Sequence, residues 1–336
     1  MLQRSWYWFV LAGLALLVGL GVFAATVPSG DYLYVPNEAR PVADKVEVEN
    51  ERVPDAAGGV YYVDVTLRRA RWLDRLAPFL RPEGATLVPG HAVTAPGQTF
   101  KQRIAAARSE MSRSKQIAAA VAMKAAGLRV EAVPRGALVE AVALDVPAAG
   151  TLASGDVIVG AAGRAVQTPA ELRDAVGTVS PGDDLRVRFR RDDKPFERTV
   201  QTVAAPDDER RAIIGVSVDQ AVRIRLPREV EIDLGDVGGP SAGLPFALEV
   251  FQSLGNDVDR GYRVAATGKV ELDGTVASVG GIKQKTYGVR SAEADVFLVP
   301  AGGNAATARR YAGALRVIAV RSFADAVRAL RALPAK

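Results

Sequence analysis

The hydrophobic pattern begins with an uncharged apolar run of 23 residues from Ser5 to Val27. As a helix rising about 1.5 Å per residue it would extend about 34 Å, and the hydrocarbon core of a bilayer is about 30 Å thick. Tyr7 and Trp8 near its start and Tyr32 beyond its end are typical of membrane interfaces. A buried core helix of this length normally carries a polar stripe, which this run lacks. The pattern predicts a membrane-spanning anchor within residues 1–30, with a cleaved signal peptide as the alternative.

The charges beside this run bear on its orientation. Arg4 precedes the run, whereas Arg40 and Lys45 follow it among seven acidic residues between Asp31 and Asp55. The short tail of four residues favours an amino terminus that stays inside and a chain whose bulk is exported. We therefore expect an uncleaved, single-pass anchor in the cell membrane, with the other domains extracytoplasmic.

Beyond the anchor, the pattern divides the chain into three segments and predicts an α+β fold. Residues 31–127 begin with a proline- and acid-rich stretch that is typical of a stalk, with one strand over 45–53. A β-rich strand over 60–67 and an amphipathic helix over 100–126 follow. Residues 128–206 contain short strands, a hairpin turn over 191–194 and a helix over 169–176, whose capping box is Thr168 and Glu171. Residues 207–336 form the third segment.

The composition excludes several kinds of site. The chain has no cysteine, which excludes disulfides, thiol nucleophiles and cysteine-bound metals. His91 is the single histidine, so a multi-histidine metal site is excluded, and we expect it to be an exposed loop residue rather than a catalytic one. Basic and acidic residues nearly balance, at 43 and 38, which does not indicate nucleic acid as a partner. We expect no cofactor and no metal.

A glycine-rich turn over 235–243 contains Ser241 and precedes an apolar helical run over 244–251. Glycines at a helix entrance permit unusual backbone conformations, and helix N–H groups favour a negative charge there. The pattern fits a nucleophilic serine beside an oxyanion hole, but alone it fits a phosphate-binding or simply tight turn as well.

A catalytic serine needs a base, and no histidine serves this segment. A buried lysine can act as the base because burial favours its neutral form. Helical spacing after Gly281 places Lys285 on one apolar stripe with Ile282, Val289 and Ala292, while Lys283 and Gln284 fall off that stripe. Lys285 is therefore the candidate, and the alternative is that its ammonium extends to solvent.

Three motifs within residues 225–300 together resemble the proteolytic domain of Lon proteases. They are Gly-Pro-Ser-Ala-Gly at 239–243, Thr-Gly at 267–268 and Val-Gly-Gly-Ile-Lys-Gln-Lys at 279–285. The resemblance implies Ser241 as the nucleophile, Lys285 as its general base, and Thr267 as the residue that hydrogen-bonds and orients the amine. It also implies an oxyanion hole from the backbone N–H groups of Gly239 and Ser241, in an α/β domain whose architecture is shared with a ribosomal protein domain. Lys269 departs from the family, which usually has an acidic residue there.

Residues 128–206 resemble a PDZ domain of the bacterial protease-associated kind. The matching pieces are residues 135–139, the stretch from Pro147 through 155–158, and residues 163–166 with the capped helix. PDZ domains bind an extended peptide by strand addition. The resemblance implies that Gly136, Ala137, Leu138 and Val139 form the carboxylate-binding loop and the edge strand. The alternative is a small β domain without a ligand.

Together these features resemble the membrane-anchored, PDZ-containing Lon-like serine proteases. The third segment, 207–336, is then the proteolytic domain. Residues 31–127 are expected to belong to it, with the 60–67 strand pairing with carboxy-terminal strands. No Gly-x-x-x-x-Gly-Lys-Ser/Thr motif occurs, so no ATPase module is expected in this chain. The expected partners are polypeptide substrates, a PDZ peptide ligand and the membrane. Lon relatives form rings, which leaves a homo-oligomer open.

Two other functions remain as alternatives. One is a membrane-anchored PDZ scaffold whose protease domain is inactive. The other is an RNA-associated protein, suggested by the basic stretch 186–198. We expect these charges to cover the solvated faces of a hairpin, so no nucleic acid is expected.

Overall fold

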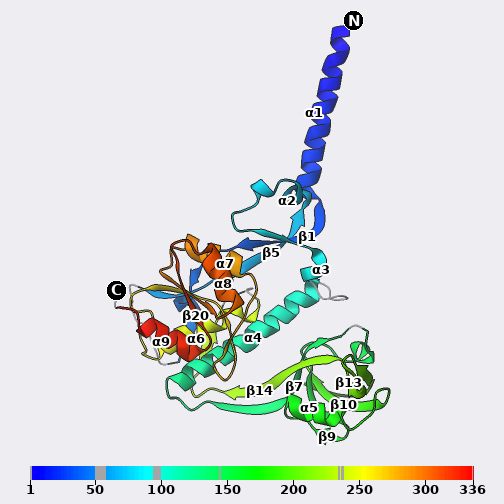
Figure 1. The fold of residues 1–336 in the computed structure, drawn as a ribbon, viewed down its shortest axis with the longest axis vertical. Coiled ribbons are helices and arrows are strands. Elements are labelled where there is room, and N and C mark those ends of the chain that lie inside the picture. Colours follow the sequence, from blue (N-terminus) through cyan, green and yellow to red (C-terminus); the bar gives the residue numbers. More distant parts are fainter. Residues whose placement is uncertain are drawn as a thin grey trace.

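The computed structural model describes residues 2–49, 58–93, 100–143, 145–233, 235, 238–334 and 336. Figure 1 shows a projecting helix, α1 (Leu2–Thr26), and a mixed body that contains the carboxy terminus. A β-rich lobe is connected to the body by two long strands, β7 (Glu131–Val142) and β14 (Val216–Arg225). The predicted α+β class is confirmed.

Helix α1 projects away from the body, and its large apolar side chains are exposed, among them Trp8, Leu14 and Phe23 (Figure 1). Its apolar part, Tyr7–Thr26, has 20 residues, which corresponds to about 30 Å of helix. A core helix would be covered by the rest of the protein, and this one is not. Its length and composition suffice to cross a membrane, and a signal sequence has the same features.

The body is built on a five-stranded sheet with the order β2-β4-β16-β19-β20. The last four of these strands run parallel. Their bounds are β2 Arg40–Pro41, β4 Gly59–Tyr62, β16 Arg263–Ala266, β19 Val296–Pro300 and β20 Arg316–Val320. Strand β4 lies between β2 and β16, so the predicted pairing of the 60–67 region with carboxy-terminal strands is confirmed for its first half.

Alternate residues of the parallel strands face two different helix layers. Val264 and Leu298 belong to a core shared with α4, α6 and α9, whereas Ala265 and Phe297 belong to a core shared with α7 and α8. Period-two alternation of strand side chains produces this arrangement. The helices are α4 Phe100–Ala125, α6 Gly243–Ser253, α7 Ile282–Ser291, α8 Gly303–Tyr311 and α9 Phe323–Arg331. The body is therefore a sheet covered on both faces.

Short elements complete the body around this sheet. Strand β3 pairs with β15, and β17 pairs with β18. The bounds are η1 Ala43–Lys45, β3 Val46–Val48, β15 Val230–Ile232, η4 Pro240–Ala242, β17 Lys269–Val270 and β18 Val276–Ala277.

A three-stranded sheet, β5-β1-β6, lies between α1 and the body. Its elements are β1 Pro28–Pro36, β5 Val65–Arg71, α2 Trp72–Leu76, η2 Pro78–Leu80, β6 Thr86–Val88 and α3 Gly90–Val93. The expectation of a stalk over 28–59 is therefore wrong for its described residues, because β1, β2 and β3 all belong to sheets. The strand expected over 45–53 is confirmed in part, since β3 covers Val46–Val48. The prolines stand at the ends of β1, where a missing N–H is tolerated, so they delimit the strand rather than prevent it.

The β-rich lobe contains a sheet with the order β11-β10-β8-β7-β14, and β9 pairs with β8. The remaining bounds are η3 Pro147–Gly150, β8 Val157–Ala161, β9 Arg164–Ala165, α5 Pro169–Val176, β10 Asp184–Arg191, β11 Lys194–Gln201, β12 Val203–Ala205 and β13 Asp208–Ile213. The predicted hairpin and capped helix are confirmed, with the Thr168 Oγ1 atom accepting from the Glu171 N–H at 3.2 Å.

The predicted domain boundary at 206/207 is wrong. Strand β14 pairs with β7 from Val216 to Arg225, so the lobe extends to residue 225. The lobe is an insertion between α4 and β15, and the body is formed by the chain on both sides of it. Residues 31–127 accordingly contribute β2, β3, β4 and α4 to the body.

Candidate active site

Ser241 lies in the single-turn helix η4, directly before α6. Gly239 precedes the turn with φ 92° and ψ 149°, a conformation that glycine adopts without the penalty other residues pay. Pro240 follows at the first helical position, where its missing N–H costs nothing. Ser241 is half-buried, so its hydroxyl is positioned by a rigid turn at the edge of the fold.

Several hydrogen bonds fix this turn to its surroundings. The Ser241 carbonyl oxygen accepts from the Gly268 N–H at 2.9 Å and from the Thr267 Oγ1 hydroxyl at 3.1 Å. The Gly268 carbonyl in turn accepts from the N–H of Leu244 at 3.0 Å. On the other side, the Ser114 hydroxyl of α4 donates to the Pro240 carbonyl at 3.2 Å. The serine backbone is therefore held from two elements.

Lys285 lies in α7 and is only 2 % exposed. Its Nζ atom donates to the Thr267 Oγ1 atom at 2.9 Å. Ile282 and Val289 are buried on the same stripe, as the helical spacing predicted. Gln284 is buried as well, contrary to expectation, because its Nε2 atom donates to the Thr86 Oγ1 atom of β6 at 2.8 Å. The β5-β1-β6 sheet therefore covers a part of α7 that lies off the apolar stripe.

Burial lowers the pKa of Lys285 from its ordinary value of 10.5 to about 7. Asp64, which follows the carboxyl end of β4, attracts the ammonium and opposes this effect more weakly. The Asp64 carboxylate is itself paired with Arg40 at 3.0 Å. A substantial fraction of the Lys285 amine is therefore neutral near pH 7, as a general base requires.

Thr267 is the residue that brings the lysine and the serine turn together. It directly follows β16, at the carboxyl ends of the parallel strands, where sites in such sheets are commonly found. Its hydroxyl proton is committed to the Ser241 carbonyl, so its oxygen accepts from the amine. The two bonds place Lys285 Nζ within about 6 Å of the Ser241 carbonyl oxygen. The Ser241 and Lys285 side chains are not hydrogen-bonded to each other.

The two expected oxyanion donors differ in their availability. The Gly239 N–H donates to the Ala107 carbonyl of α4 at 2.8 Å, so the expectation that it is free to bind an oxyanion is wrong for this structure. The Ser241 N–H has no hydrogen-bond partner among the described residues, as is usual in the first turn of a helix. Of the two expected donors, it is therefore the one available for a negative charge.

The residues expected to bind a peptide lie inside the sheet of the β-rich lobe. Gly136, Ala137, Leu138 and Val139 all belong to β7 and pair with residues 218–221 of β14. Ala137 and Leu138 also pair with β8. The expectation that 136–139 is an edge strand is wrong, because β14 occupies that edge.

Strand β14 is instead the terminal strand of this sheet among the described elements, and it contacts α5. The sequence reasoning missed it because residues after 206 were assigned to the next domain. The alternation of Val216, Val218 and the later apolar residues after Gly215 was the signal that could have identified it.

The backbone of His91 lies in α3, and its side chain is outside the described residues. The part of the chain that the structure describes contains no group of three or more histidine, aspartate or glutamate residues arranged to hold a metal.

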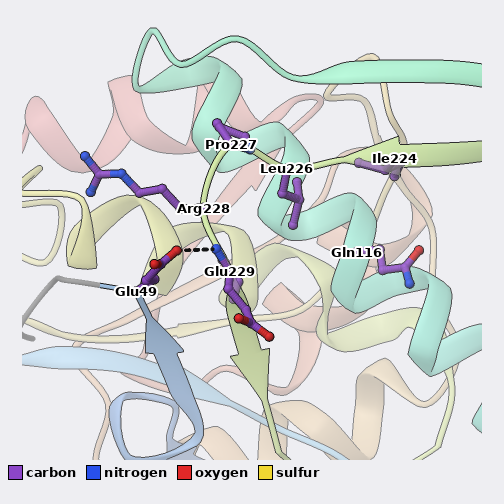
Figure 2. Close-up of a pocket in the computed structure, with 8 residues that line it drawn as sticks. Glu49, Gln116, Ile224, Leu226, Pro227, Arg228 and Glu229 are labelled. Carbon is purple, nitrogen blue, oxygen red and sulfur yellow. Dashed lines mark hydrogen bonds between the residues drawn. The ribbon is translucent and has the colours of Figure 1, made fainter.

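A pocket of about 460 Å³ lies where the chain returns from the β-rich lobe to the body. Figure 2 shows the residues that line it. The Glu229 N–H donates to the Glu49 carboxylate at 3.3 Å beside it. Ser241, Thr267 and Lys285 do not line this cavity, which therefore belongs to the junction between lobe and body.

Comparison with known proteins finds one family in the lobe and another in the body. Residues 125–202 match the PDZ domain family, and residues 222–327 match the family described as the Lon protease (S16) C-terminal proteolytic domain. The chain is 28% identical over 107 residues to Lon protease 2 of Bacillus subtilis (strain 168). That match covers 32% of this chain and 18% of the Bacillus protein.

Solved structures of PDZ domains are also similar to part of the chain. The PDZ domain of an SdrC-like protein from Listeria monocytogenes has 27% identity and a TM-score of 0.24, covering 25% of this chain and 87% of that one. Its counterpart from Listeria innocua has 27% identity and a TM-score of 0.23, covering 25% and 92%. From the two family matches, the chain combines a PDZ domain with a Lon-type (S16) C-terminal proteolytic domain.

Proposed function

We propose that this chain is a membrane-anchored serine endopeptidase that hydrolyses peptide bonds with a Ser241–Lys285 dyad. The observation that carries the proposal is the buried Lys285 amine, held by Thr267 beside the Ser241 turn, with its pKa lowered to about 7. A neutral amine has a lone pair, and its bond to Thr267 uses one of its protons and leaves that lone pair available. The proposed dyad requires the Ser241 hydroxyl to reach this lone pair.

The proposed reaction uses these groups in turn. The Ser241 Oγ atom attacks the scissile carbonyl carbon while Lys285 Nζ accepts its proton. The Ser241 N–H at the start of η4 stabilises the oxyanion of the tetrahedral intermediate. The C–N bond breaks as the lysine ammonium returns the proton to the leaving amine, and an acyl-enzyme forms. Water, deprotonated by the same amine, hydrolyses this ester and restores Ser241.

The test is peptide hydrolysis by the full-length protein, with fluorescently labelled unfolded casein as the substrate. Ser241→Ala and Lys285→Met should each abolish cleavage, and Ser241→Ala should also abolish labelling by a fluorophosphonate probe. Lys124→Met, an exposed lysine of α4, is the matched control and should leave cleavage unchanged. Wild-type protein without activity or labelling would favour the inactive scaffold, and undiminished turnover in either dyad variant would refute the assignment.

We further propose that the PDZ domain binds peptide segments of substrates or partners at the outer edge of β14. The support is the strand order, which leaves this edge next to α5 rather than next to another described strand. Addition of a peptide pool with free carboxyl termini should protect the amides of 216–220 from hydrogen exchange, and an amidated pool should protect them less. Protection of β11, at the opposite edge of the sheet, would show that the wrong edge has been chosen.

We propose that α1 spans the cell membrane once, with both domains on the extracytoplasmic side. The exposed apolar surface of α1 supports the anchor. Because the chain has no cysteine, a single Arg328→Cys variant reports topology directly. A membrane-impermeant maleimide should label it in intact cells, and labelling only after lysis would reverse the orientation.

A further inference from the structure

The segment between β5 and β6 exposes large apolar side chains that the fold does not use. Leu76, Phe79 and Leu80 are 69%, 83% and 61% exposed, and Leu73 beside them is 36% exposed. Apart from α1 itself, Val133 is the remaining large apolar side chain with comparable exposure in the described residues. Exposed apolar side chains that gather in one place mark an interaction surface.

This surface is held in place by a charged network. The Asp74 carboxylate accepts from both terminal nitrogens of Arg68, at 2.7 and 2.8 Å, and from the Arg71 N–H at 2.7 Å. The Arg81 side chain donates to the Asp74 carbonyl. These bonds lower the pKa of Asp74, chiefly through the Arg68 contact. The apolar side chains are therefore presented outward by a fixed backbone.

The position of this segment indicates its partner. The Trp72 N–H donates to the Val27 carbonyl at 3.1 Å, directly after the last residue of α1. Figure 1 shows α2 at the foot of α1. The apolar surface of α1 thus continues onto α2 and η2, at the depth where a spanning helix leaves the hydrocarbon core. Tryptophan is enriched at that depth, and the Trp72 ring lies against Arg75.

The charge of the segment fits the same partner. Between residues 68 and 81 there are five arginines and one acidic residue. Basic side chains beside an exposed apolar face are typical of protein segments that lie in the interface of a bilayer containing anionic lipids.

We propose that α2 and η2 form a second membrane contact, in which Leu76, Phe79 and Leu80 insert into the acyl–headgroup boundary of the bilayer that α1 spans. The exposed Arg69 and Arg71 bind lipid phosphates at the rim of the inserted surface. Arg68 and Arg75 are paired with Asp74 and Asp31. This inference rests on the proposed membrane-spanning role of α1. Burial of the three side chains in lipid removes their apolar surface from water, which the folded chain alone does not do.

The contact also has a consequence for the active site. The Gly84 carbonyl and the Thr86 hydroxyl, which follow this segment, accept from the Gln284 side chain at 3.2 and 2.8 Å. Gln284 precedes Lys285 in α7. Insertion of α2 and η2 therefore fixes the height of the catalytic helix above the membrane through a short and rigid connection.

The experiment uses nitroxide labels on single cysteines in the full-length, otherwise cysteine-free chain, reconstituted in vesicles of phosphatidylcholine and phosphatidylglycerol. Leu14→Cys in α1 is the lipid reference and Arg328→Cys in α9 is the water reference. Labels at Phe79→Cys and Leu80→Cys should collide with a water-soluble nickel chelate several-fold less often than the Arg328→Cys label. Their collision rate with oxygen should rise toward that of Leu14→Cys.

Three results would overturn the proposal, and they differ from one another. If the Phe79→Cys label behaves like the Arg328→Cys label while Leu14→Cys is in lipid, the second contact is wrong and the anchor stands. If the Leu14→Cys label is itself in water, the spanning helix fails, and the second contact fails with it. If spin–spin broadening at Phe79→Cys disappears on dilution with unlabelled chain, a second copy of the protein covers the surface instead of lipid.

Discussion

Lys285→Met should stabilise the protein against unfolding, although it removes the general base of the proposed dyad. The pKa of Lys285 falls from 10.5 in the unfolded chain to about 7 in the folded protein. Between these values the unfolded state binds more protons, so the free energy of unfolding of the wild type rises as the pH increases from 7 to 10.5. At about 1.4 kcal/mol per pKa unit, the neutral buried amine costs about 4 kcal/mol of stability at pH 7.

Lys285→Met removes that cost and also removes the hydrogen bond to Thr267, which contributes about 1 kcal/mol. The variant should therefore be more stable than the wild type by about 3 kcal/mol at pH 7. The advantage should disappear as the pH rises through 10.5, because above this value the amine is neutral in both states.

Denaturant unfolding in detergent micelles, followed by tryptophan fluorescence at pH 7 and above pH 10, measures this difference. Lys124→Met, at an exposed position of α4, should show no such pH-dependent advantage. If the difference between wild type and Lys285→Met is the same at both pH values, the amine is not neutral in the folded state, and the reasoning fails.

Three further changes test the surroundings of the site. Thr267→Val removes the hydroxyl that orients the amine, so kcat should fall by roughly 10²-fold at unchanged KM. Thr267→Ser keeps a hydroxyl and should retain most of the wild-type kcat. Equal losses of kcat in both variants would argue against this orienting role. Both carboxylate oxygens of Glu249 in α6 are buried without a partner, and burial raises its pKa to about 7. The folded state therefore binds more protons than the unfolded state between pH 4.5 and 7. Ionisation of Glu249 should lower the free energy of unfolding by about 3 kcal/mol as the pH rises through this range. Glu249→Gln should abolish this loss, and an unchanged pH profile of the unfolding midpoint would contradict the account. Gly239→Ala places a residue with a Cβ atom at a φ of 92°, so it should cost about 1–3 kcal/mol of stability and lower peptidase activity. A variant with wild-type stability and activity would show that the turn needs no glycine.

Much of the candidate site was predictable because its features are local in sequence. The spacing after Gly281 predicted the buried stripe of Lys285, and the glycines around Ser241 predicted the unusual backbone before α6. The hydrogen bond of the Gly239 N–H could not be predicted from spacing, because this N–H donates to the carbonyl of Ala107, which is more than a hundred residues away in the chain.

The parts that could not be predicted depend on long-range pairing. Strand β4 inserts beside β16, and β14 closes the sheet of the PDZ domain, although neither partner is near in sequence. Gln284 lies off the apolar stripe of α7, yet it is buried and donates to Thr86 of the β5-β1-β6 sheet. Helical periodicity identifies the side of a helix that is apolar, but not the polar contacts that a distant segment brings to its other side.

The most direct test of the Ser241–Lys285 dyad is the rate at which a fluorophosphonate probe labels Ser241 in the full-length protein as a function of pH. The lowered pKa of Lys285 predicts that the rate rises through a single ionisation with an apparent pKa of about 7 and that Lys285→Met abolishes the rise. A rate that increases only near the ordinary lysine value of 10.5, or that is unchanged in Lys285→Met, would contradict the claim that this buried amine activates the serine.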